Sequence, residues 1–341
     1  MKRVSIIGVD LAKRVFQVHG VDQDHKVMVQ KQLTRSEVVA WFSKLEPCLV
    51  GMEACSTSHY WAQEIGKLGH DVKLIPPAYV KPYVRRQKND RADAAAICEA
   101  VSRPSMRFVE IKTKDQQAIQ VLHRARELLI QQVTQTGNAL RAHLAEFGWI
   151  FVQGNKGLSQ AIAITQDTKN TDLPAVAQQA LFSLVDQLKL LKQEIMKLDK
   201  QMMAWHKTNA DSQRLATIPN IGVVTASAIV SAIGTGKQFK SGREFSAWIG
   251  MVPRQNSSGG KERLGRISKK GNPYLRKLLV LGATTQLRGG RIEKAAGGLW
   301  FGQLVRRKPK RVAAVALANK TARVAWAVLT KGESYRASAA A

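Results

Sequence analysis

The chain has 341 residues, enough for two or three domains with separate cores, and 45% of them are hydrophobic, as in globular proteins. Lys and Arg number 53 against 25 Asp and Glu, so the formal charge is +28 and a polyanionic partner, above all nucleic acid, is favoured. The lack of an apolar run of about twenty residues excludes a membrane span, and Cys48, Cys55 and Cys98 show no metal or disulfide spacing, so we expect reduced thiols in a cytoplasmic protein.

The first segment, residues 1–115, is predicted to be an α/β domain. Its expected elements are strands over 4–10, 15–21 and 26–33, a helix over 36–45, a strand over 48–54, a helix, and a strand over 71–77. The first three strands alternate or are apolar and are joined by short turns, which indicates an antiparallel meander. Three strands followed by alternating helix and strand is the element order of an RNase H-like domain.

Four acidic residues of this segment are candidate metal ligands. Asp10 ends the first predicted strand, Glu53 lies near the end of the fourth, and Asp90 and Asp93 share one face at the start of a helix. In an RNase H-like sheet the first and fourth strands are neighbours, so we expect the carboxylates to converge, and a divalent cation makes such crowding tolerable. Hard oxygen ligands favour Mg²⁺, with Mn²⁺ as the alternative. The two helix acids also have a purely structural explanation, because acidic groups stabilise the first turn of a helix.

A second fold competes for the same N-terminal pattern. The stretch "GVDLAKRVFQV" also resembles the first phosphate loop of actin-like sugar and acetate kinases. Those proteins need a second glycine-rich phosphate loop and a duplicated domain. The sequence has neither, and Asp90 and Asp93 would have no role there, so we favour the RNase H-like fold.

The middle segment, residues 116–208, is predicted to be helical. Apolar residues at helical spacing run from Ile119 to Phe147, before a looser stretch. From Leu181 to Trp205 they recur at alternating intervals of three and four, which forms an a/d seam of more than three heptads. Packing on the chain's own domain would explain this seam. Its sustained spacing, with Lys and Gln between, favours a coiled coil with another copy of the chain.

The last segment, residues 209–335, is predicted to be mostly helical and carries most of the charge. From Asp211 onward there are 24 Lys and Arg against five Asp and Glu, so +19 of the +28 lies there. The stretch "LATIPNIGVVTASAIVSAIG" predicts a helix–hairpin–helix-like unit, whose turn either presents N–H groups to a phosphate or merely joins helices. Taken alone, "NSSGG" is typical of a flexible polar loop. The candidate cations around it, for a phosphate clamp or a general nucleic-acid face, are Arg254, Arg263, Arg266, Lys269 and Lys270.

Five ordered motifs carry a resemblance to a known family: "IGVDLAK", "GMEACSTSHYW", "KNDRADAAAI", "LATIPNIGVVTASAIVSAIG" and "PRQNSSGGKERLGRISKKGNPYLRKLL". Together, over nearly the whole chain, they resemble the DEDD transposases of the insertion-sequence family numbered one-ten, in particular its eleven-eleven branch. These proteins are bridge-RNA-guided DNA recombinases. The resemblance implies a RuvC-like domain that holds Mg²⁺ with Asp10, Glu53, Asp90 and Asp93.

The resemblance also implies a nucleophile and partners. A serine of the C-terminal transposase domain attacks the scissile DNA phosphate, and the matching residue is Ser258, with Ser257 beside it as a one-residue ambiguity. A structured noncoding guide RNA, the bridge RNA, pairs with donor and target DNA. The family works as a tetramer in which the acids and the serine come from different subunits.

Three functional classes follow from these patterns. The first is a recombinase that exchanges strands through a covalent phosphoserine. The second is a metal-dependent nuclease, such as a junction resolvase, in which water attacks and the serine is incidental. The third is a basic nucleic-acid-binding protein with a decayed acid site. A covalent protein–DNA adduct separates the first class from the others, and metal-dependent cleavage separates the second from the third.

Overall fold

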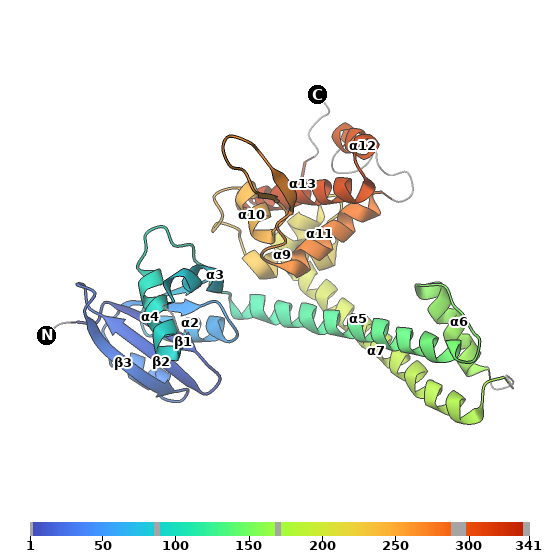
Figure 1. Ribbon diagram of the computed structural model, residues 1–341, viewed down its shortest axis with the longest axis horizontal. Helices are drawn as coiled ribbons and strands as arrows, with labels where there is room; N and C mark the ends of the chain where they lie inside the picture. The colour runs from blue at the N-terminus through green and yellow to red at the C-terminus, as the bar shows by residue number, and fades with distance from the viewer. Residues whose placement is uncertain (1–2, 85–88, 168–171, 288–297, 337–341) are drawn as a thin grey trace. The chain divides into compact units, whose positions relative to one another are not determined.

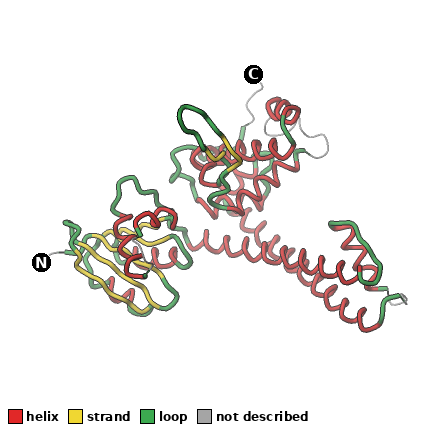
Figure 2. Tube along the Cα trace, in the orientation of Figure 1, coloured by secondary structure: helices red, strands yellow, loops and turns green. Residues whose placement is uncertain are grey.

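The structure, a computed structural model, describes residues 3–84, 89–167, 172–287 and 298–336, so Lys88 of the motif "KNDRADAAAI" lies outside the described residues (Figure 1). The chain divides into two compact units, residues 1–113 and 114–341. The first unit mixes strands and helices and the second is almost wholly helical (Figure 2). The predicted limit between middle and C-terminal segments, at residue 208, falls inside the second unit.

The N-terminal unit is built on one five-stranded sheet of order β3-β2-β1-β4-β5. Its elements are β1 (Ile6–Leu11), β2 (Val15–Val21), β3 (Val27–Thr34), α1 (Val38–Phe42), β4 (Leu49–Glu53), α2 (Ser58–Gly66), β5 (Asp71–Ile75), α3 (Pro77–Val80), η1 (Lys81–Tyr83) and α4 (Asp90–Val101). The first three strands form the expected antiparallel meander, and β4 and β5 run parallel to β1. The strands that carry Asp10 and Glu53 are therefore neighbours, as predicted for an RNase H-like domain.

The two faces of this sheet pack against different helices. Ile7 and Val9 of β1 lie in a core with Phe42 of α1 and Trp61 of α2. The intervening residue, Gly8, lies directly under α4 on the other face. This alternation follows from the period of two in a strand, and it places Asp10 on the α4 face because it lies two residues after Gly8.

The second unit begins with two long helices that pack side by side and run in opposite directions (Figure 1). They are α5 (Lys114–Ala145) and α7 (Ala175–Thr208), with α6 (Asn155–Gln166) at their far end. Leu181 and Leu188 of the predicted seam are buried in one cluster with Leu140 and Leu144 of α5. The N-terminal part of the seam therefore packs within its own chain, which is the alternative that the sequence had left open.

The remaining helices enclose the largest hydrophobic core of the protein. They are α8 (Ala210–Ala216), α9 (Val223–Ile233), α10 (Gly242–Ile249), α11 (Pro273–Thr285), α12 (Gly298–Arg307) and α13 (Lys310–Lys331), with a hairpin of β6 (Pro253–Gln255) and β7 (Leu264–Ile267) between α10 and α11. α8 and α9 lie where the sequence predicts a helix–hairpin–helix-like unit. α13 is long and apolar enough to cross a membrane by length and composition alone, but half of its apolar window is buried within the protein. Leu317 and Ala318 of this helix lie in the core, as expected for the central helix of a domain.

Candidate metal centre and serine hairpin

Three of the four predicted acids meet at one edge of the N-terminal sheet. Asp10 lies near the end of β1, and Asp90 and Asp93 lie in the first turn of α4. One carboxylate oxygen from each lies within 4.8 Å of the other two. The helix begins at Asn89, whose side-chain oxygen accepts a hydrogen bond from the N–H of Ala92 at 2.8 Å. This cap aims the first turn, and hence both aspartates, at the end of β1.

A glycine makes this meeting possible. A Cβ atom on Gly8 would lie only 2.2 Å from the carbonyl oxygen of Ala94 and 2.4 Å from the nitrogen of Cys98. Only a residue without a side chain lets α4 lie this close to β1. Asp93 directly precedes Ala94, and Asp10 lies two residues beyond Gly8. The close packing of α4 on β1 at Gly8 therefore brings the carboxylates together.

Glu53 lies one strand away at the same edge. The last register pair between the parallel strands joins Val9 to Met52, so Glu53 follows at the level of Asp10. Its carboxylate is outside the group of three oxygens within 4.8 Å. Both Glu53 and Asp10 act on the thiol of Cys55: partial burial raises the pKa of this thiol, and the two carboxylates raise it further. Glu53 therefore lies near enough to share the electrostatic field of the cluster without belonging to its closest group.

The donor set of this cluster fits a hard divalent cation. All of its potential ligand atoms are carboxylate oxygens, the type that Mg²⁺ and Mn²⁺ prefer, and no His or Cys takes part in the group formed by the described residues. Three carboxylates this close repel one another unless a proton or a cation neutralises part of their charge. The helix N-terminus offsets only a fraction of that charge. The arrangement can therefore hold a cation and present it to a phosphate at the open sheet edge.

The predicted nucleophile lies on the β6–β7 hairpin of the second unit. Gly259 and Gly260 both have positive φ, at 57° and 74°, and the N–H of Lys261 donates to the carbonyl of Ser258 at 3.1 Å. This is the tight hairpin turn that glycine pairs favour. Ser258 thus lies beside the tip of an exposed hairpin rather than in a shapeless loop.

The two neighbouring serines differ in what their hydroxyls contact. The hydroxyl of Ser257 accepts a hydrogen bond from the backbone N–H of Arg263, at 3.1 Å, and so joins the two arms of the hairpin. Among the residues that the structure describes, none makes a hydrogen bond to the hydroxyl of Ser258. The hairpin therefore uses Ser257 structurally and leaves the Ser258 hydroxyl available to an outside group.

The five predicted phosphate-binding cations surround this hairpin and are all exposed. They are Arg254, Arg263, Arg266, Lys269 and Lys270. None of them forms an ion pair with a carboxylate in the described part of the chain. The base of the hairpin is held by Arg276, which donates to the carbonyls of Ile249 at 2.7 Å and Lys270 at 3.1 Å. The hairpin is thus a cationic projection on a fixed base.

The helix–hairpin–helix-like turn packs on a neighbouring helix. Asn220 has a positive φ of 76°, and a Cβ on Gly282 of α11 would lie 2.3 Å from its carbonyl oxygen. α9 then begins after Gly222, which makes no side-chain cap, so backbone N–H groups remain at this helix end. Its binding of a phosphate stays a prediction.

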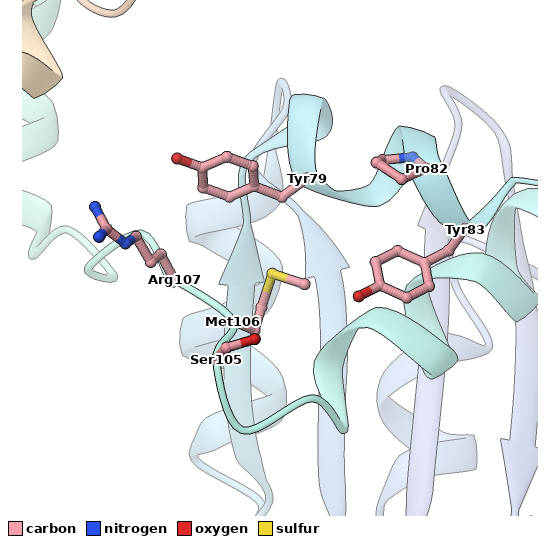
Figure 3. A pocket seen from close by; sticks show the side chains of 6 residues that line it. All are labelled: Tyr79, Pro82, Tyr83, Ser105, Met106 and Arg107. Carbon is pink, nitrogen blue, oxygen red and sulfur yellow. The ribbon is translucent and has the colours of Figure 1, made fainter. Parts of the chain in front are cut away.

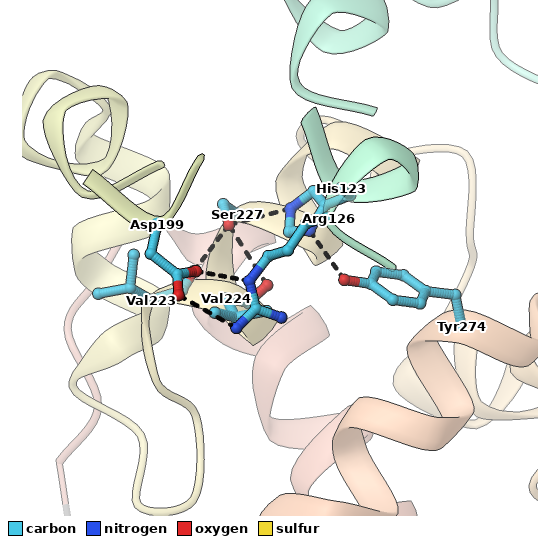
Figure 4. Close-up of polar contacts among 7 residues, drawn as sticks. All are labelled: His123, Arg126, Asp199, Val223, Val224, Ser227 and Tyr274. Atoms are coloured by element: carbon cyan, nitrogen blue, oxygen red, sulfur yellow. Dashed lines mark hydrogen bonds and ion pairs between the residues drawn. The ribbon is translucent and has the colours of Figure 1, made fainter. Parts of the chain in front are cut away.

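A buried polar cluster connects three helices of the second unit and was not predicted (Figure 4). His123 of α5 contacts the hydroxyls of Tyr274 on α11, at 3.0 Å, and Ser227 on α9, at 3.1 Å. Ser227 donates to the carbonyl of Val223 at 2.7 Å, so it accepts from Nε2 of His123, and Nδ1 accepts from Tyr274. Burial lowers the pKa of His123 to about 4, so the ring is neutral. His123 follows Ile119 by four residues, which is the one sequence signal that it would be buried.

A hollow of about 320 Å³ lies on the N-terminal unit beside α3 and η1 (Figure 3). The side chain of Met106 lies between the rings of Tyr79 and Tyr83, and Arg107 extends away from them. Aromatic rings and a guanidinium group are surfaces on which nucleobases stack. This hollow has no acidic residue in its lining and shares no residue with the acid cluster.

Two parts of the chain match known transposase families. Residues 7–148 match the DEDD transposase family of IS110 type, and residues 212–295 match the family described as "Transposase IS116/IS110/IS902 family". A probable family 20 transposase of Pseudomonas aeruginosa is 46% identical over 98% of this chain and 99% of its own length. The transposase for insertion sequence element IS1328 of Yersinia enterocolitica is 39% identical over 98% of this chain and 99% of its own. The transposase for IS1111A of Coxiella burnetii is 39% identical over 99% of this chain and 93% of its own.

Proposed function

Because the chain belongs to the IS116/IS110/IS902 family of transposases, we propose that it is an RNA-guided DNA recombinase that exchanges strands through a phosphoserine intermediate. The observation that carries this proposal is the convergence of Asp10, Asp90 and Asp93 at one sheet edge. A group of carboxylates that can hold a divalent cation is the expected core of a phosphoryl-transfer site. Glu53 completes the proposed four-acid set by turning toward the cation from the neighbouring strand.

Ser258 is the proposed nucleophile. Its oxygen attacks the scissile phosphorus, the bond to the departing sugar oxygen breaks, and the serine keeps the DNA as a phosphodiester. Attack by a sugar hydroxyl of another strand then releases the serine, so joining needs no ATP. A serine hydroxyl is a poor nucleophile at neutral pH, and a divalent cation at the acids would lower the cost of its deprotonation and neutralise phosphate charge. The lack of a hairpin partner for the Ser258 hydroxyl, in contrast to Ser257, supports this choice.

The proposed partners are donor DNA, target DNA and a structured guide RNA. The formal charge of +28 and the five exposed cations around the hairpin support binding to phosphate backbones. Pairing by RNA would supply sequence specificity that backbone contacts cannot. In the proposed tetramer the acids of one subunit act with the serine of another.

The surface of the long helices supports self-association. Val121 and Leu128 of α5 are 67% and 54% exposed, and Met196 and Met203 of α7 are 57% and 44% exposed. Each pair is separated by one heptad, the spacing of a coiled-coil seam. Since Leu188 is already buried against α5, these outer residues are the proposed contact with other copies.

The test is to change the pairing segment of the guide RNA and sequence the DNA junctions. New junctions at the sites that match the altered guide are expected, in a reaction that needs Mg²⁺ and is lost in Asp93→Asn. Junctions at unchanged sites would contradict guidance by RNA.

Cleavage by water is a second candidate, favoured by one observation. The acid cluster is complete within the N-terminal unit, whereas Ser258 belongs to the other unit. A RuvC-like nuclease of this kind would leave a free 5′-phosphate, form no adduct and retain cleavage in Ser258→Ala.

A further inference from the structure

A second hollow, of about 640 Å³, lies at the turn that follows Asp10, and three cationic side chains line it. Its volume is in the range of ligand sites. It is lined by Lys13, Arg14, Thr34, Arg35, Tyr60 and Trp61, among others, and no carboxylate lines it. Lys13, Arg14 and Arg35 form no ion pair with a carboxylate in the described part of the chain. Three uncompensated cations in one concave site call for an anionic ligand.

Hydrogen bonds between two turns fix the backbone that carries these cations. The backbone N–H of Arg35 donates to the carbonyl of Arg14 at 3.1 Å, and its guanidinium donates to the carbonyl of Lys13 at 3.5 Å. These bonds tie the β1–β2 turn to the β3–α1 turn. The nearest acid along the chain, Glu37, accepts two hydrogen bonds from Thr34 at 2.7 Å each, which lower its pKa. The Glu37 carboxylate is therefore hydrogen-bonded to Thr34 at the start of α1.

Tyr60 and Trp61 are the aromatic residues that line the pocket, and Phe16 lies in the core beneath it. The guanidinium carbon of Arg35 lies 5.2 Å from the ring centre of Trp61 and 5.9 Å from that of Phe16, both of which are buried. Such stacking limits the freedom of the guanidinium group before any ligand binds. Tyr60, in contact with Trp61, is 46% exposed and offers an open face to a planar group. Cationic side chains that contact the phosphate backbone, beside an exposed aromatic ring that stacks on a base, are the groups that bind single-stranded nucleic acid.

The pocket and the acids share one edge of the sheet. Lys13 follows Asp10 by three residues in the turn that leaves β1. Asp10 faces α4, whereas Phe16 and Trp61 belong to the core on the α1 and α2 face. A strand that crosses this edge would therefore meet the carboxylates on one side and the cations on the other. The cations would hold phosphates that the carboxylates alone would repel.

We propose that this pocket, defined by Lys13, Arg14, Arg35 and Tyr60, binds the backbone of the single DNA strand whose neighbouring phosphate enters the acid site, with an unpaired base stacked on Tyr60. The inference rests on the proposed function in that the acids act on DNA. It adds a second binding site for the same strand, across the sheet edge from the acids.

The test measures binding of the full-length protein to labelled single-stranded DNA in EDTA at several salt concentrations. Lys13→Gln with Arg14→Gln removes two pocket cations, and Lys26→Gln with Lys44→Gln removes two exposed cations elsewhere on the same unit. Lys26 lies at the opposite end of the sheet, in the β2–β3 turn. Each neutralised phosphate of a single strand contributes about 0.7 to the slope of log K against log salt. We expect the pocket variant to lose about 1.4 of slope and the control to lose none.

Tyr60 gives an independent readout. Tyr60→Ala should weaken binding about tenfold at every salt concentration, and Tyr60→Phe should restore it, because stacking needs the ring and not the hydroxyl. Equal slopes for the pocket and control variants would overturn the proposal. An effect seen only with RNA of the same sequence would overturn DNA as the occupant, and an equal effect on duplex DNA would overturn the single strand. The assay needs neither a metal nor cleavage, so a loss of catalysis at the acids would not change its result. If the pocket variants bind DNA normally, the role of the acid cluster can still be tested separately.

Discussion

Gly8→Ala should separate the proposed metal ligands without changing any of them. The added Cβ would lie 2.2 Å from the carbonyl oxygen of Ala94, whereas ordinary contacts begin near 3.4 Å. The two atoms must therefore move apart by about 1.2 Å, and neither can rotate away, because the Cβ is fixed to the backbone of β1 and the oxygen belongs to the backbone of α4. α4 must shift, and Asp93 shifts with it from Asp10. We expect a loss of about 1–3 kcal/mol in the free energy of unfolding, as for other overpacked cores, and a loss of about 100-fold in DNA cleavage.

Gly20→Ala is the matched control in the same sheet. Its Cβ would meet a methyl group of Val4 at 3.1 Å and the Cβ of Val29 at 3.5 Å, so a small side-chain movement relieves the contact. Urea unfolding gives the stability of each variant, Mn²⁺ titration reports the acid cluster, and cleavage of labelled DNA reports activity. Gly8→Ala protein that binds Mn²⁺ and cleaves DNA like Gly20→Ala protein would refute the idea that this glycine sets the distance between the acids.

Three further predictions concern the acids, assembly and pH. Asp10→Asn or Asp93→Asn should abolish recombination while leaving RNA binding in a gel-shift assay unchanged, and full activity in either variant would exclude the metal assignment. Leu188→Glu should unfold the α5–α7 pair by placing a charge at a fully buried position, at a cost of several kcal/mol, whereas Met196→Glu should reduce the oligomer in sizing chromatography with its helix content intact. Burial lowers the pKa of His123 to about 4, so just below pH 6.5 the unfolded state binds a proton at this residue and the folded state does not. The contribution of the neutral His123 ring to the free energy of unfolding is therefore full above pH 6.5 and falls by about 2 kcal/mol between pH 6.5 and 5. Urea unfolding of His123→Gln should show a flatter pH dependence than the unchanged protein over this range, and identical curves would contradict this role.

The fold of the N-terminal unit was predictable because its signals are local. The alternation in residues 15–21, the apolar strand before Asp10 and the order of elements were sufficient for the meander and the strand order, which the structure confirms. The convergence of Asp10 with Asp90 and Asp93 followed from that order. The place of Glu53 just outside the closest group depends on side-chain direction, which strand order does not determine.

Other features depend on contacts that a linear pattern does not contain. The Leu181–Trp205 seam has the same period whether it packs on α5 or on a second copy, so only the structure shows that Leu188 is buried within the chain. The β6–β7 hairpin was missed because both of its strands are exposed, which removes the alternation that identifies a strand. The partner of His123, Tyr274, lies 151 residues away in the chain. No local spacing indicates such a pair.

The proposed covalent phosphoserine can be detected directly. Labelled DNA, guide RNA and Mg²⁺ are mixed with the protein, the products are separated by denaturing electrophoresis, and the modified peptide is mapped. We expect an adduct on Ser258 that is lost in Ser258→Ala and persists in Ser257→Ala, because the Ser257 hydroxyl accepts a hydrogen bond within the hairpin. An adduct on Ser257, or strand exchange without any adduct, would contradict it.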